Sequence, residues 1–170
     1  GPYMAGPGKP PLELAKTDAD IVWVFNMIDE CGVFPHNITS CSVLVVGDRL
    51  WTSTSNGVDY GHVETPAPTA PSLIVLDKKT GKLVAEESSG LSQRILHSNW
   101  GSPAYLKTET AELGIYGGPD GWLYAFHPEP VAAQEGGFAT LKEAWRYDCN
   151  PPEYRTKDGR PLKYATKPGP

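Results

Sequence analysis

The sequence has few cysteines, no excess of charge of one sign and no long apolar run, and each shortage excludes a class of protein. Three cysteines in 170 residues are too few and too scattered for a zinc ribbon or a CxxC redox site. Acidic and basic residues are interspersed and the net charge is −5, which argues against the basic face of a nucleic-acid-binding protein. No run approaches the ~18 apolar residues of a membrane-spanning helix, and no segment has the pattern of a signal peptide.

Glycine and proline are abundant. The 18 glycines and 17 prolines make up about a fifth of the chain, well above ordinary usage, and this favours short strands joined by turns. Five tryptophans and eight tyrosines supply the large apolar anchors that a disordered chain lacks. The length suffices for one domain with a substantial core. We therefore expect an all-β fold.

The clearest local pattern is SLIVLDKKTGKLVAE, residues 72–86, which predicts a strand, a tight turn and a returning strand. The turn follows from its residue types, because the Asp77 side chain can accept hydrogen bonds from the backbone that follows it. Gly81 supplies the positive φ that closes such a turn.

This stretch resembles the tryptophan-docking repeat of the PQQ-like (quinoprotein-like) β-propellers. Asp77, Thr80 and Gly81 match that repeat, whereas Val75 and Ala85 depart from it. The resemblance extends over roughly residues 18–149, including the segments PHNITSCS, TSNGVD, NWGSPAY and PDGWLYAF. It implies antiparallel four-stranded propeller blades and, for the exported bacterial type, a periplasmic or extracellular location.

The strand pattern repeats along the chain. Trp23, Ala85 and Trp145 are spaced 62 and 60 residues apart, a long period for a propeller blade. We expect about two blades and the first strand of a third over residues 18–149, with Trp23 and Trp145 packed between blades. Residues 1–17 are expected to form an extended arm and residues 150–170 an irregular tail. The expected strands are 20–27, 41–46, 49–55, 72–77, 82–87, 102–107, 113–117, 122–127 and 143–148.

Loop lengths distinguish the two ends of the blades. The connections at 47–48 and 77–81 are short, whereas those at 28–40, 56–71 and 88–101 are long and should share one end. Long loops on a rigid scaffold usually carry binding residues. The expected binding face therefore contains the polar residues His36, Asn37, Asn56, Asp59, His62, Arg94, His97, Asn99 and Asp120.

These polar residues have two interpretations. His36, His62 and His97 could bind a metal together with Asp59, because imidazoles and a carboxylate suit Zn²⁺. Alternatively the same groups cap loop backbone and face solvent. No pair has a close ligand spacing such as HExxH, which favours the second interpretation and predicts no bound metal. The pair Asn56-Gly57 is a turn signal.

The resemblance suggests two functions. Family members include alcohol dehydrogenases that use pyrroloquinoline quinone (PQQ) with Ca²⁺, and non-enzymatic scaffolds of outer-membrane assembly. The enzymes are similar in carrying an adjacent Cys-Cys disulfide, which this sequence lacks. We therefore expect a non-catalytic propeller segment that binds partners through its long-loop face and needs no cofactor. The alternative is a fragment of a PQQ- and Ca²⁺-dependent quinoprotein alcohol dehydrogenase.

Two blades cannot close a propeller ring, which needs about 4–8. The expected partner is the rest of a longer propeller or further copies of the chain, joined through open apolar blade faces, and a protein partner is compatible with either. The cysteines allow a Cys31–Cys41 or a Cys41–Cys149 disulfide, or none, since nothing in the sequence fixes their geometry.

Overall fold

The regular secondary structure of the described residues is mainly β-strand. The computed structural model describes residues 10, 13, 15–17, 21–37, 41–95, 97–133, 137–154, 156–157 and 160–161. Its helical segments are short: α1 (Met27–Cys31), η1 (Leu91–Gln93) and η2 (Pro152–Tyr154). The strands are β1 (Leu44–Val46), β2 (Arg49–Ser53), β3 (Leu73–Asp77), β4 (Leu83–Glu87), β5 (Ala104–Lys107), β6 (Glu112–Gly117), β7 (Trp122–Val131), β8 (Thr140–Asp148), β9 (Thr156–Lys157) and β10 (Arg160–Pro161).

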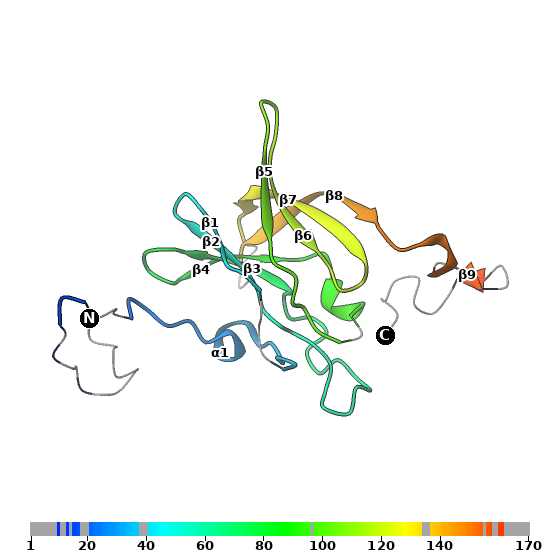
Figure 1. The fold of residues 1–170 in the computed structure, drawn as a ribbon, viewed down its shortest axis with the longest axis horizontal. Coiled ribbons are helices and arrows are strands. Elements are labelled where there is room, and N and C mark those ends of the chain that lie inside the picture. The colour runs from blue at the N-terminus through cyan, green and yellow to red at the C-terminus, as the bar shows by residue number, and fades with distance from the viewer. Residues whose placement is uncertain are drawn as a thin grey trace.

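Eight strands form one mixed sheet in the order β1-β2-β3-β4-β8-β7-β6-β5. The runs β1–β4 and β5–β8 are each antiparallel, and β4 and β8 join them by parallel pairing. The outer strands β1 and β5 come close to one another, and the Ser42 N–H donates to Ser102 Oγ at 2.8 Å beside them. The sheet is therefore nearly closed into a barrel (Figure 1).

The two short turns of the first half form as their sequences predict. Gly47 adopts φ 60° between β1 and β2, where Val46 pairs with Arg49. Between β3 and β4, the Asp77 carboxylate accepts the backbone N–H of Lys79 at 3.0 Å and that of Thr80 at 2.7 Å. These bonds lower the pKa of Asp77, with the backbone of Thr80 contributing most.

Trp23 lies against this Asp77 turn. Its Nε1–H donates to the carbonyl of Lys78 at 3.0 Å, and its ring covers Gly81, which has φ 70°. A Cβ on Gly81 would come within 2.4 Å of the ring, so glycine is required for this contact as well as for the turn. The contact joins the segment before α1 to the first half of the sheet.

The barrel interior is filled by apolar side chains from both halves. Trp51 of β2 is fully buried and its ring touches Gly114 of β6, where a Cβ would lie 2.5 Å from the ring. The ring therefore spans the interior from the first half to the second. The buried cluster comprises Trp51, Leu73, Val75, Ala85, Leu91, Ile95, Tyr116, Tyr124, Phe126 and Leu141.

The all-β expectation is confirmed, but the arrangement in separate four-stranded antiparallel blades is wrong. The halves share backbone hydrogen bonds across β4 and β8, including the Glu86 N–H to the Ala139 carbonyl at 3.0 Å. The inner faces of the two halves pack against each other. The open blade faces that motivated self-assembly therefore do not occur in the described barrel.

Two expected strand assignments also differ. Residues 21–26 alternate between half-buried and exposed side chains, yet they join no strand, and Met27 already begins α1. The Asn26 side chain accepts the Ile28 N–H at 3.1 Å and nucleates this helix. Residues 143–148 belong to β8, which completes the second half rather than opening a third, and Trp145 is 40% exposed rather than buried between blades.

The chain ends lie mainly outside the described residues. The expected arm at 1–17 is described only at 10, 13 and 15–17. Within the expected irregular tail, the described part contains η2 and the two-residue strands β9 and β10, which pair with each other.

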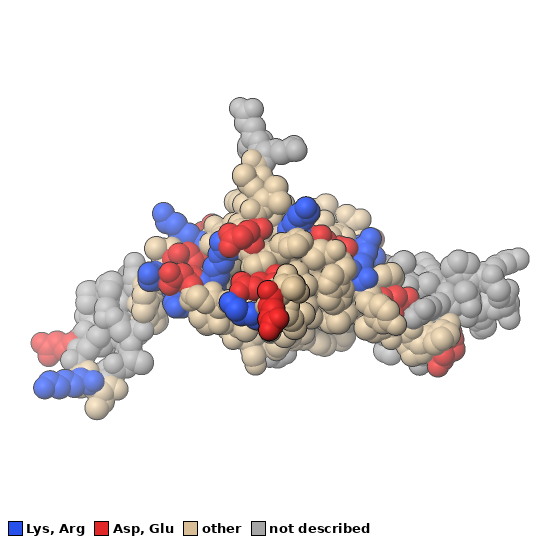
Figure 2. Space-filling model, turned by 90° about the horizontal axis from the view of Figure 1, so that it is seen from above, with Lys and Arg blue, Asp and Glu red and all other residues tan. Residues whose placement is uncertain are grey.

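Acidic and basic side chains are interspersed on the face drawn in Figure 2. The same face shows no large patch of one sign. Among the described residues, no helix has the length and apolar character needed to cross a membrane.

Candidate metal centre

Three long loop segments meet at one end of the barrel, as their lengths predicted. The β2–β3 loop pairs on one side with the segment after α1, through an antiparallel bridge between Pro35 and Asn56. On its other side it pairs with the β4–β5 loop, through a bridge between Gly57 and Ser98. In Figure 1 this end lies opposite the projecting β5–β6 turn.

Gly57 allows these three segments to approach closely. A Cβ on Gly57 would lie 2.3 Å from the carbonyl oxygen of His97 and 2.6 Å from Cβ of His36. Only glycine fits between two backbones at this separation. Asn56 and Gly57 therefore occupy the centre of a three-segment contact rather than the simple turn that their sequence indicated.

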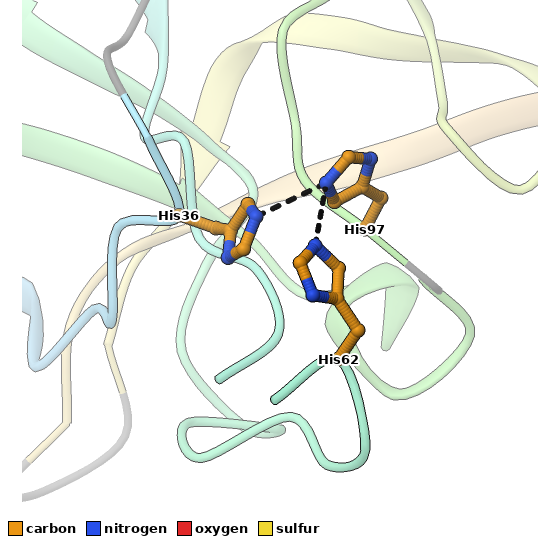
Figure 3. A group of neighbouring side chains, drawn as sticks. All are labelled: His36, His62 and His97. Carbon is orange, nitrogen blue, oxygen red and sulfur yellow. Dashed lines mark hydrogen bonds between the residues drawn. The ribbon is translucent and has the colours of Figure 1, made fainter. Parts of the chain in front are cut away.

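This contact brings three histidines together, one from each segment (Figure 3). Nε2 of His97 lies 3.0 Å from Nε2 of His36 and 3.2 Å from Nε2 of His62. One ring nitrogen from each residue lies within 4.8 Å of the other two. His36 is buried, whereas His62 and His97 are exposed, so the cluster opens to solvent on one side.

The backbone fixes which nitrogen of the buried histidine donates. His36 Nδ1 lies 2.9 Å from the carbonyl oxygen of Val58, which can only accept a hydrogen bond. The proton of that bond is therefore on Nδ1, and in the neutral tautomer Nε2 of His36 is the nitrogen with the lone pair. A backbone carbonyl in this position is a common second contact of a metal-binding histidine, because it fixes the tautomer and the ring orientation.

His97 lies at the centre of the cluster. Its ring packs edge-on against Trp100, with centroids 4.9 Å apart. Desolvation lowers the pKa of His97, and the neighbouring His36 and His62 lower it further. The neutral imidazole, which is the metal-binding form, is therefore favoured at this position.

Two of the ring-nitrogen separations are of the size that a shared metal ion requires. Zn–N bonds of about 2.0–2.1 Å in a tetrahedral site place two ligand nitrogens roughly 3.3 Å apart. The separations of 3.0 and 3.2 Å are close to that value. The same two contacts are also within hydrogen-bond distance, with donor and acceptor set by the tautomers of the rings.

Asp59 does not join the cluster, although the sequence placed it among the candidate ligands. Its Oδ1 accepts the backbone N–H of Val63 at 2.8 Å and that of Glu64 at 3.2 Å, and these bonds lower the pKa of Asp59. The carboxylate therefore shapes the turn that presents His62. That turn is tight, because His62 has φ 56°, a conformation uncommon for a residue with a side chain.

A buried polar layer supports the loops. Asn56 and Asn99 are completely buried. Oδ1 of Asn56 accepts the Phe34 N–H at 2.9 Å, and Nδ2 of Asn99 donates to the Asn56 carbonyl at 3.0 Å. These two asparagines of the expected binding face connect the loops from within. Asn37 lies on the surface of the same segment with φ 61°.

Arg94 and Asp120 form a separate network. Asp120 is fully buried, and its Oδ2 accepts Arg94 Nε–H at 3.1 Å and the hydroxyl of Tyr124. Arg94 also donates to the carbonyls of Ser89 and Gly90. These bonds tie the β4–β5 loop to the β6–β7 turn, and neither residue is part of the histidine cluster.

A groove begins at His62. It has a volume of about 350 Å³, and its apolar lining comes from Val58, Val63, Pro68 and Ile95. Small-molecule sites have volumes of this order. Neither the groove nor the roles of Gly57 and Val58 follow from local sequence patterns, because they depend on three segments meeting.

No family model, curated protein or solved structure matches this chain. The resemblance to PQQ-like repeats therefore rests on the motif residues Asp77, Thr80 and Gly81. The site is interpreted below from its own geometry.

Proposed function

We propose that this protein binds a divalent transition metal ion such as Zn²⁺ at its long-loop face, through His36, His62 and His97. The observation that carries the proposal is the convergence of three ring nitrogens, one from each loop segment, within 4.8 Å of one another. Neutral imidazole nitrogens suit Zn²⁺ and its borderline neighbours, whereas Ca²⁺ takes oxygen ligands. The donor set therefore gives no support to the Ca²⁺ of a quinoprotein dehydrogenase.

A bound metal would add a further link between the loops. It would join the segment before β1 to the β2–β3 and β4–β5 loops, which are also connected by bridges at Asn56 and Gly57 and by hydrogen bonds of Asn56 and Asn99. Binding to the folded state alone would stabilise it by about 2.7 kcal/mol at a free metal concentration 100 times Kd. The proposal keeps the long-loop face as the binding face, but it departs from the sequence-based expectation of a face that binds partners and no metal.

The test is a metal titration of the purified chain after chelator treatment. We expect one equivalent of Zn²⁺ per chain by elemental analysis, and a tetrahedral visible spectrum when Co²⁺ replaces it. Replacing His36, His62 or His97 by alanine should each weaken binding by on the order of 100-fold or more.

His127 provides the matched control. It is the fourth and last histidine of the sequence, and it is an exposed residue of β7 outside the cluster. His127→Ala should keep the affinity of the unchanged protein. A stoichiometry well below one, or an equal loss on His127→Ala, contradicts the proposed site.

A further inference from the structure

We propose that the metal held by His36, His62 and His97 activates a water molecule that hydrolyses small uncharged carboxylic esters bound in the groove beside His62. This inference rests on the proposed metal site and goes beyond it in assigning an activity and a substrate class. It is carried by the ligand number, the charge of the ligands and the position of the groove.

The ligand number leaves room for water. Among the described residues, only His36, His62 and His97 form a candidate metal-binding group, and no fourth His, Cys, Asp or Glu joins them. Structural zinc sites are usually closed by four protein ligands, whereas catalytic sites use three and keep one position for water. The open position lies on the solvent side, because His62 and His97 are exposed and His36 is buried.

The ligands leave the full charge of the metal in place. All three are imidazoles, and the nearby Asp59 carboxylate is engaged by the backbone of its own turn. Three neutral ligands lower the pKa of a zinc-bound water to about 7. A hydroxide nucleophile is therefore available near neutral pH.

The groove defines the substrate. Its lining is shared between apolar side chains and a polar rim that includes Glu64, Thr65 and Gln93. The exposed carboxylate of Glu64 disfavours a negative charge on the part of the substrate that lies beside it. A volume of about 350 Å³ suits a small molecule whose apolar part lies along Val63 and Pro68.

The reaction balances without another reactant. The metal-bound water loses a proton to solvent on the open side, and the resulting hydroxide forms a bond to the ester carbonyl carbon. The tetrahedral oxyanion then collapses, and the bond to the leaving oxygen breaks. The leaving group departs as an alcoholate or phenolate, so that ester and water give carboxylate, alcohol and a proton, with no change of oxidation state.

The experiment measures hydrolysis of 4-nitrophenyl acetate by the zinc-loaded chain between pH 6 and 9, with an equal concentration of free Zn²⁺ as reference. We expect saturable turnover that rises with pH through about 7, as the bound water ionises. The anionic ester 4-nitrophenyl hemisuccinate should react more slowly. His127→Ala should leave the rate unchanged, and His62→Ala should reduce it to the free-Zn²⁺ level.

Two groove variants test the substrate position. Gln93→Trp should raise KM several-fold at unchanged zinc affinity, because its ring fills the rim of the groove. Glu64→Gln should reduce the preference for the neutral ester over the anionic one. Circular dichroism checks that every variant is folded.

Each outcome decides a different point. Stoichiometric zinc binding with a rate no higher than free Zn²⁺ overturns the hydrolytic inference and leaves the metal site standing. Failure to bind zinc overturns both proposals. Turnover that neither groove variant changes shows that the assignment of the substrate to this groove is wrong.

Discussion

Replacing Gly57 by alanine should damage both the fold and the metal centre, because this residue separates two of the three histidine segments. The added Cβ would lie 2.3 Å from the His97 carbonyl oxygen, about 1.1 Å short of an ordinary contact of 3.4 Å. It would also lie 2.6 Å from Cβ of His36. Neither atom is the free end of a flexible side chain, so the two segments themselves must move apart.

The size of the effect follows from this displacement. Forcing extra atoms into a packed site costs about 1–3 kcal/mol of unfolding free energy. Metal ligands must be held within about 0.5 Å of their productive positions. A shift of roughly 1 Å between His36 and His97 should therefore weaken zinc binding by about 10- to 100-fold, comparable to the loss of a supporting contact.

The assay combines urea unfolding with zinc titration against a chromophoric chelator. Gly117→Ala is the matched control, because a Cβ at Gly117 has no neighbour within 4 Å. It makes the same glycine-to-alanine change without the collision. If Gly57→Ala unfolds at the same urea concentration as Gly117→Ala and binds zinc within twofold of the unchanged chain, the close approach is not what assembles the site.

Three further predictions concern the rest of the fold. Trp23→Ala should lower the unfolding free energy by about 2 kcal/mol, because a half-buried ring and one hydrogen bond are lost. Trp145→Ala should cost less than about 1 kcal/mol, because its ring is already 40% exposed. Equal losses of the two variants in urea unfolding would contradict the structure. Asp120→Asn should lower the unfolding free energy by about 3 kcal/mol, because it removes the charge that pairs with Arg94 at a buried position. An unchanged thermal midpoint would show that this ion pair is dispensable. Burial and a neighbouring carboxylate raise the pKa of the Cys31 thiol to about 12. Iodoacetamide at pH 8 should therefore alkylate Cys31 far more slowly than the exposed Cys149. Equal alkylation rates by mass spectrometry would refute this.

Local patterns predicted the turns and most strands, because these depend on neighbouring residues. The Asp77 turn is an example, since its carboxylate bonds the backbone two and three residues later and Gly81 closes it with φ 70°. The alternation at 21–26 misled the strand assignment, because that segment has no partner strand and instead docks Trp23 on the turn.

The joining of the two halves could not be predicted in this way. A four-stranded antiparallel run has the same pattern in a blade as in half a barrel, and the parallel pairing of β4 with β8 distinguishes them here. Trp145 lies on β8 within this joined sheet, and its side chain is 40% exposed. Such pairings depend on residues far apart in the chain.

The candidate site was partly visible in the sequence. His36, His62 and His97 stand 26 and 35 residues apart, which gives no ligand spacing, although the loop lengths placed them at one end. Asp59 was grouped with them by proximity, yet its carboxylate bonds its own turn. The sequence left the disulfide pairing of the cysteines open, and all three are free thiols in the structure.

The parallel pairing of β4 with β8 has a consequence for how the chain folds. Hairpins such as β1–β2 and β5–β6 connect residues close in sequence and should form within microseconds. The pairing of Glu87 with Leu141 must close a loop of more than fifty residues, and the approach of β1 to β5 must close another of similar length. We therefore expect the two antiparallel units to form early. In a slow final step β4 pairs with β8 while β1 approaches β5, and Trp51 is enclosed. The closure of these long loops should set the folding rate.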